Sequence, residues 1–379
     1  REFLRQRSRS VHFPQITQDM QAFILYTSGT SGKPKGAPLT HGNVVSVLKA
    51  GMEWLEDWGA VREKVLGVLP MFHIYGLALN YALPLSIGAE MVLVPAPKPK
   101  LYQAAITKTR PTVLPGVPTL YDKIIEWAVE TNADLSSIHT SISGASTLPV
   151  ETIERWENAT GGRLIEGYGL TETCAAACVN NADGNKVGTV GRPVNGYSVR
   201  INDDGEIEFA GPGVFQQYWR NPSATQEAIT DGWFNTGDLG EVDEEGFVRI
   251  TGRKKDLIVT AGGKNISPGP LEEIIRQDPL IANALVVGDG KPFVGVLVTL
   301  DEEELKRWKA NHNIPANKKV SELAQDPALR AEVQDAVNMA NATVSRTEAI
   351  KKFRILDRDL SEQHDEMTPT MKVKRNVVF

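Results

Sequence analysis

Short apolar runs alternate with helical patterns through the first half of the chain. The apolar runs predict strands at Ala22–Tyr26, Val65–Leu69, Met91–Val94, Thr112–Leu114, Thr140–Ile142 and Leu164–Ile165. The patterns between them predict helices over about His41–Trp54, Ile74–Ser86, Tyr102–Thr109, Thr119–Glu130 and Pro149–Thr160. Strands that alternate with helices are typical of the α/β class, in which helices cover mostly parallel sheets.

The pattern changes after about Asn195. Short strands are predicted at Ser198–Ile201, Glu206–Ala210 and Phe247–Ile250, with turns at Asp204-Gly205 and Glu245-Gly246. Closely spaced strands joined by turns indicate an antiparallel, barrel-like β subdomain.

Beyond Arg253 the pattern is mixed, as in a small α+β domain. A helix is predicted at Pro270–Arg276, strands at Ala284–Val287 and Val294–Leu300, and then helices to about Thr347. The boundary is placed near Gly252–Lys255, which divides the chain into domains 1–252 and 253–379.

The segment Val65–Ala89 contains no Lys, Arg, Asp or Glu and is long enough to raise the question of a membrane span. Proline and glycine residues, including Gly67, Pro70, Pro84 and Gly88, divide it into short pieces. Burial in an α/β core is therefore the preferred interpretation, with no transmembrane segment.

Charge and cysteine content exclude some functions. A net charge of −6 argues against a general nucleic-acid binder, which would show a basic face. Cys174 and Cys178 have no neighbouring histidine, so buried packing is favoured over a metal site or a disulfide framework. The basic start, Arg1–Ser10, lacks the apolar core of a secretory signal. A cytoplasmic location is therefore expected, and peripheral contact at the inner membrane face is left open.

A loop rich in Gly, Ser and Thr is the most informative segment. It reads Thr27, Ser28, Gly29, Thr30, Ser31, Gly32, Lys33, Pro34 and Lys35, after a predicted strand and before a predicted helix. Backbone amides and hydroxyls at such a place can surround phosphate oxygens, and the two lysines add positive charge. The spacing of its glycines does not fit the P-loop of kinases and GTPases. A plain surface turn is the alternative.

This loop resembles the signature of the adenylate-forming superfamily, which includes acyl-CoA synthetases, luciferases and peptide-synthetase adenylation domains. Further blocks match in the family's order: Pro70–His73, Gly167–Thr173, Trp233–Asp238, Gly252–Asp256 and Thr368–Lys372. The resemblance extends from about Ala22 to Val378. It implies a large N-terminal adenylation domain, incomplete at its start, and a mobile C-terminal lid domain.

The resemblance implies roles for the residues around the nucleotide. The Tyr168 ring would stack on adenine, the Thr171 hydroxyl would meet phosphate, and Glu172 would hold Mg²⁺. One carboxylate with substrate phosphates is an ordinary Mg²⁺ site. Taken alone, a Glu before a helix is more often a capping residue.

Further roles come from the same resemblance. Asp238 would accept hydrogen bonds from the ribose hydroxyls with Arg253 beside it, and Gly144 and Ala145 would pack beside adenine. His73 would lie near the carboxylate substrate, although a lone histidine after a strand is more often a core residue.

The resemblance makes Lys372 the predicted catalytic residue, which would bridge the substrate carboxylate and the α-phosphate of ATP. A fixed cation there would stabilise the charge that develops in the transition state. A solvated basic tail is the alternative. Lys255 matches the family's hinge, and the glycines Gly262 and Gly263 would let coenzyme A approach closely.

The resemblance to the long-chain fatty acyl-CoA synthetase branch rests on Met371 before the lysine and on the run Gly262–Pro268. The expected substrates are therefore a fatty acid, ATP and coenzyme A, with Mg²⁺. A fatty acyl-AMP ligase, a carrier-protein-loading adenylation domain and an inactive nucleotide-binding fragment remain as alternatives.

Overall fold

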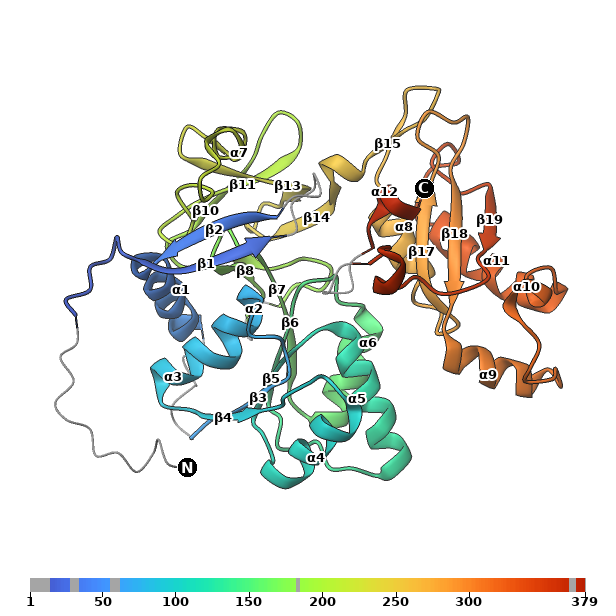
Figure 1. The fold of residues 1–379 in the computed structure, drawn as a ribbon, viewed down its shortest axis with the longest axis horizontal. Coiled ribbons are helices and arrows are strands. Elements are labelled where there is room, and N and C mark those ends of the chain that lie inside the picture. The colour runs from blue at the N-terminus through green and yellow to red at the C-terminus, as the bar shows by residue number, and fades with distance from the viewer. Residues whose placement is uncertain (1–13, 28–33, 55–61, 182–184, 368–372, 379) are drawn as a thin grey trace.

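The computed structural model describes residues 14–27, 34–54, 62–181, 185–367 and 373–378. The N-terminal part, up to Arg253, contains a mostly parallel sheet and an antiparallel sheet, and the C-terminal part, from Lys254, lies to one side of it (Figure 1). The predicted fold class is confirmed.

The mostly parallel sheet has the strand order β4-β3-β5-β6-β7-β8-β9. Its parallel strands are β3 (Lys64–Gly67), β4 (Glu90–Leu93), β5 (Val113–Gly116), β6 (Thr140–Ser143) and β7 (Arg163–Leu170). The strands β8 (Ala175–Val179) and β9 (Arg192–Pro193) continue the sheet in antiparallel fashion. The parallel strands end at a common edge, where loops carry the candidate site residues.

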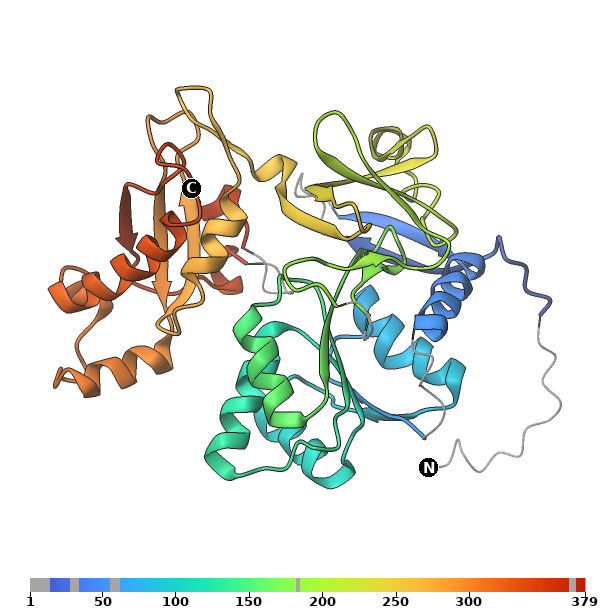
Figure 2. The same ribbon diagram turned by 180° about the vertical axis from the view of Figure 1, so that it is seen from behind.

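Helices cover both faces of this sheet (Figure 1 and Figure 2). On one face lie α4 (Pro99–Thr109), α5 (Pro118–Thr131) and α6 (Val150–Thr160). They bury an apolar cluster that includes Tyr102, Ile124 and Trp156. On the other face lie α1 (His41–Trp54), α2 (Ile74–Gly76), the π-helical turn η2 (Leu77–Ala82) and α3 (Leu83–Ile87).

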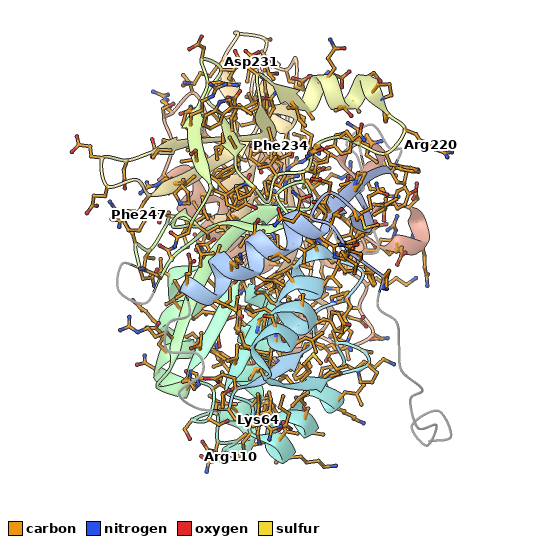
Figure 3. All side chains as sticks on the ribbon, turned by 90° about the vertical axis from the view of Figure 1, so that its left-hand side faces the viewer. Lys64, Arg110, Arg220, Asp231, Phe234 and Phe247 are labelled. Carbon is orange, nitrogen blue, oxygen red and sulfur yellow. The ribbon has the colours of Figure 1, made fainter. Side chains whose placement is uncertain are left out.

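The antiparallel sheet follows in sequence. It pairs β10 (Ser198–Ile201), β11 (Glu206–Ala210), β12 (Ile229–Thr230), β13 (Trp233–Val242) and β14 (Val248–Arg253), with α7 (Pro222–Ala228) beside them. The hairpin of β1 (Gln21–Thr27) and β2 (Lys35–Thr40) shares a core with it that includes Leu39, Phe209 and Phe215. Figure 3 shows Phe234 inside this region and Lys64 and Arg110 at the opposite end of the N-terminal part.

The C-terminal part is built on a sheet with the order β17-β18-β19, from β17 (Ile281–Val287), β18 (Gly295–Leu300) and β19 (Lys352–Ile355). Its helices are α8 (Pro268–Ile275), α9 (Glu302–Asn311), α10 (Val320–Leu323), α11 (Pro327–Asn341) and α12 (Arg375–Val378). Shorter elements are η3 (Lys254–Asp256), β15 (Ile258–Val259), β16 (Asn265–Ile266) and η4 (Glu362–His364). Its separate apolar core includes Leu271, Trp308 and Val333.

The structure corrects one prediction about the Gly/Ser/Thr-rich loop. A helix was expected to follow the loop, but β2 lies between the loop and α1. Thr27 pairs with Lys35 across the hairpin, so the loop joins two antiparallel strands. The argument that a helix N-terminus lies at this loop is therefore wrong.

The uncharged segment Val65–Ala89 forms β3 and the continuous helical stretch from Ile74 to Ile87. Among the described residues, no helix combines the length and the apolar character that a bilayer crossing requires. Both cysteines are buried, Cys174 at 3% exposure and Cys178 at 0%, which confirms their interpretation as core residues.

Candidate functional site

A buried carboxylate joins residues from β7, β13 and β14. Asp238 is 3% exposed. The Tyr168 hydroxyl donates a hydrogen bond to its Oδ2 atom at 2.6 Å. Arg253 Nε lies 3.0 Å from its Oδ1 atom. Burial, with the Asp238 charge as the second cause, raises the pKa of Tyr168 well above its ordinary value, so the phenol stays protonated and able to donate.

The strand register explains this arrangement. Asp238 stands opposite Arg253 in the antiparallel pair β13–β14, where the side chains of facing residues lie close together. Gly237 precedes it with φ +77°, a value that favours glycine. The Thr236 hydroxyl accepts a hydrogen bond from the Asp238 amide at 3.1 Å, which fixes the turn.

A second carboxylate, Glu172, lies after the end of β7 and is 6% exposed. The Tyr218 hydroxyl donates to its Oε1 atom at 2.6 Å. Lys35 Nζ lies 5.0 Å from the centre of the Tyr218 ring. Burial raises the pKa of Glu172, while the Tyr218 hydrogen bond and the Lys35 charge oppose that rise. Lys35, the first residue of β2, therefore lies close to this carboxylate.

The turn that presents Thr171 and Glu172 is unusually constrained. Cys174 and Ala175 both have positive φ values, 56° and 90°. Each such residue costs about 1–3 kcal/mol, and strain of this kind concentrates at functional sites. A Cβ on Gly169 would lie 1.6 Å from the Ala175 carbonyl oxygen, so only glycine fits there.

The fit to Mg²⁺ can be judged from the oxygen donors. Among the described residues, no group of three or more His, Cys, Asp or Glu side chains could hold a metal ion. Glu172 alone fits the type of site in which one carboxylate and the substrate phosphates share the ion.

The turn at His73 is connected to the loop after β6. His73 is the N-cap of α2, and its Nδ1 atom accepts from the Tyr75 amide at 3.2 Å. The Tyr75 hydroxyl is 2.5 Å from the Ile142 carbonyl oxygen and 3.1 Å from that of Gly116. A Cβ on Gly144 would lie 3.3 Å from the Tyr75 ring. Tyr75 thus joins the His73 turn to the loop of Gly144 and Ala145, which has φ +71° at Ala145.

Several predicted residues lie outside the described residues, namely Ser28, Gly29, Thr30, Ser31, Gly32, Lys33 and Lys372. The residues that flank Lys372 are described. Met367 and Val373 form an antiparallel bridge, and the Lys374 amide donates to the Glu366 carbonyl at 2.7 Å. Arg375 is ion-paired with the buried Glu272 of α8, which attaches this end of the chain to the C-terminal part.

The predicted hinge and the glycine loop are both described. Lys255 lies in η3, directly after β14, and burial lowers its pKa, with the Arg253 charge as the second cause. Gly263 has φ +77°, and a Cβ on Gly262 would meet nothing closer than 4.0 Å. Gly262 is therefore not required by the packing around it.

Sequence reasoning missed Tyr75, Tyr218 and Glu166. Their partners lie far along the chain, so no local spacing marks them. The Glu166 side chain is buried beneath the loop after β6, where it accepts from the Leu148 amide at 3.1 Å. Burial raises its pKa to about 8, and the charge of Glu273 on α8 adds to that rise while the Leu148 hydrogen bond opposes it.

Comparison with known proteins identifies the family of the chain. The profile of the family described as AMP-binding enzyme matches residues 4–219, more than half of the chain. The chain belongs to the AMP-binding enzyme family. The profile of the AMP-binding enzyme C-terminal domain matches residues 255–379.

Relatives within the AMP-binding enzyme family include the long-chain-fatty-acid–CoA ligase FadD15 of Mycobacterium bovis. It is 39% identical over an alignment that covers 94% of this chain and 67% of FadD15. The long-chain-fatty-acid–CoA ligase of Bacillus subtilis is 38% identical over 77% of this chain and 54% of its own length. This chain thus spans about two thirds of one relative and about half of the other.

Solved structures of AMP-binding enzymes have the same fold. O-succinylbenzoate coenzyme A synthetase (MenE) from Bacillus subtilis, in complex with ATP and magnesium ion, has a TM-score of 0.77 and 26% identity. That match covers 99% of this chain and 73% of the MenE chain. An ATP-bound RpMatB–BxBclM chimera has a TM-score of 0.76 and 32% identity, covering 96% of this chain and 68% of its own.

Proposed function

We propose that the protein activates a carboxylic acid of the long-chain fatty acid class with ATP and then transfers the acyl group to coenzyme A. The observation that carries this proposal is the buried Asp238 carboxylate held between Tyr168 and Arg253. A carboxylate fixed in this way can accept hydrogen bonds from both ribose hydroxyls, and the ring of Tyr168 offers a face to adenine. The names of the curated relatives support the choice of fatty acid.

The first half-reaction joins the acid to AMP. A carboxylate oxygen attacks the α-phosphorus of ATP, the bond to the β-phosphate oxygen breaks, and pyrophosphate leaves with the bonding electrons. Mg²⁺, when bound at Glu172, would neutralise part of the phosphate charge. The Thr171 hydroxyl donates to phosphate, and Lys372 supplies the cation between the two approaching anions.

The second half-reaction forms the thioester. The coenzyme A thiol releases its proton to solvent, and its sulfur attacks the acyl carbon. The bond from that carbon to the phosphate oxygen breaks, and AMP leaves with the electron pair. Pantetheine passes the loop of Gly262 and Gly263 after the residues beyond Lys255 have rotated about that hinge. The open space around Gly262 supports this route, because the packing within the protein leaves room for a side chain at this position. Close approach of pantetheine would give a reason for glycine here. Rotation of a lid about a short hinge is a common enzyme motion.

A screen of pyrophosphate release tests the proposal. Acids from acetate to palmitate are supplied with ATP, with and without coenzyme A, and the products are identified by mass. The proposal predicts release that increases toward palmitate, and acyl-CoA as the product when coenzyme A is present. Accumulation of acyl-AMP in the presence of coenzyme A would instead favour an acyl-AMP ligase or a carrier-protein-loading domain. Absence of release with every acid would favour an inactive nucleotide-binding protein.

A further inference from the structure

The last two residues before the proposed hinge are held from different sides. Arg253 ends β14 and contacts Asp238, while Lys254 begins η3 and contacts two other carboxylates. Lys254 Nζ is 2.6 Å from Asp204 Oδ2 and 3.2 Å from Glu206 Oε2. Arg253 is the last residue in extended backbone and Lys254 is the first residue of η3, and the two cations reach different carboxylates.

Glu206 contacts both Lys254 and the turn that precedes Asp238, the proposed ribose ligand. Its Oε1 atom accepts from the Gly237 amide at 2.7 Å, and Gly237 immediately precedes Asp238. Gly237 and Asp238 of β13 are thus connected to Lys254 and Arg253 by two separate carboxylates. The end of β14 and the residue after it are therefore linked to β13 twice, through the carboxylates of Asp238 and Glu206.

The two ion pairs of Lys254 are unequal. The Asp204 side chain is 67% exposed, and exposed pairs contribute little because water screens them. The Glu206 side chain is 8% exposed, so loss of Lys254 would leave a buried carboxylate with one partner fewer. The Glu206 contact is therefore the part of this arrangement that holds the backbone.

We propose that Lys254 is a positioning residue which, through Glu206, fixes the end of β14 so that Arg253 stays on Asp238. The same contact ties Lys254 to β11 and β13, so domain rotation is confined to the residues after Lys254. This inference rests on the proposed function for the roles of Arg253 and Lys255. The contact itself is a property of the fold and can be tested without any activity.

Hydrogen exchange measured by mass spectrometry tests the contact directly. Lys254→Met removes the charge and keeps much of the side-chain length, whereas Lys254→Arg keeps the charge. Arg249→Met is the matched control, because Arg249 also lies on β14 and its Nε atom is 3.7 Å from an exposed carboxylate, Glu241. Lys254→Met should speed exchange of the amides from residue 250 to 258 about three- to tenfold, with other peptides unchanged. Lys254→Arg and Arg249→Met should match the unmodified chain in that segment.

Kinetics test the consequence for the nucleotide. Lys254→Met should raise KM for ATP in pyrophosphate exchange about three- to tenfold, with kcat changed less than about twofold, and Lys254→Arg should restore KM. Unchanged exchange at residues 250–258, or an equal increase with Arg249→Met, would overturn the inference. Faster exchange throughout the protein would also overturn it, because it would show a general loss of stability. If no acid supports pyrophosphate exchange, the proposed function fails while the hydrogen-exchange result still decides the contact.

Discussion

Replacing Glu166 by Gln should stabilise the protein at neutral pH. The carboxyl is 6% exposed, and its pKa is about 8 in the folded chain against an ordinary value of 4.5. Above pH 4.5 the unfolded chain releases this proton, whereas the folded chain retains it up to about pH 8. The free energy of unfolding therefore falls as the pH rises toward 8. Each pH unit in this interval costs the folded state about 1.4 kcal/mol.

The size of the effect follows from that interval. At pH 7 the cost of keeping Glu166 protonated reaches about 3 kcal/mol, and it stops growing above the folded pKa of about 8. Glutamine is uncharged and its Oε1 atom can still accept from the Leu148 amide. Glu166→Gln should therefore recover about 3 kcal/mol at pH 7 and almost nothing below pH 4.5.

Urea unfolding of both chains between pH 4.5 and 8.5 measures this difference. Glu157→Gln is the matched control, since Glu157 also accepts one backbone amide, that of Leu164 at 3.1 Å, but is only half-buried. Glu157→Gln should raise the free energy of unfolding at pH 7 less than Glu166→Gln does. A difference between Glu166→Gln and the unmodified chain that does not grow with pH would refute the reasoning, as would a less stable variant at pH 7.

Three further substitutions have defined outcomes. Lys372→Ala should lower the rate of acyl-AMP formation about 10²–10³-fold and spare thioester formation from supplied acyl-AMP. Single-turnover kinetics measure both rates, and a normal rate of acyl-AMP formation would exclude Lys372 as the catalytic cation. Gly262→Leu should block the thioester step and leave pyrophosphate exchange intact, and it is a cleaner probe than Gly263, whose φ of +77° would strain any side chain. Gly169→Ala should lower the melting temperature sharply, because its Cβ would collide with the Ala175 carbonyl oxygen, and an unchanged melting temperature would contradict that geometry.

Periodicity in the sequence predicted most of the elements in the N-terminal part. The helix expected at His41–Trp54 and the strands expected at Ser198–Ile201 and Glu206–Ala210 have the bounds found in the structure. These segments succeed because one face of each is apolar. The strand β2 was missed, because its sequence, Lys35 to Thr40, contains glycine and proline and lacks an alternating pattern.

The candidate site was predictable only in part. The motif match indicated Tyr168, Asp238 and Arg253, and the structure brings these three together. The contact of Tyr218 with Glu172 and the burial of Glu166 depend on tertiary packing, so no local pattern reveals them. Backbone strain at Cys174 and Ala175 was equally invisible, since neither residue type favours positive φ.

The discrimination between ATP and 2′-deoxy-ATP in acid-dependent pyrophosphate exchange tests the central claim most directly. If Asp238 accepts from the ribose hydroxyls, the unmodified chain should prefer ATP by about tenfold or more in kcat/KM, because 2′-deoxy-ATP leaves the buried carboxylate with one hydrogen-bond donor fewer. Asp238→Ala should bring that ratio close to one, whatever its overall activity. An Asp238→Ala variant that still prefers ATP as strongly as the unmodified chain would show that the ribose is held elsewhere.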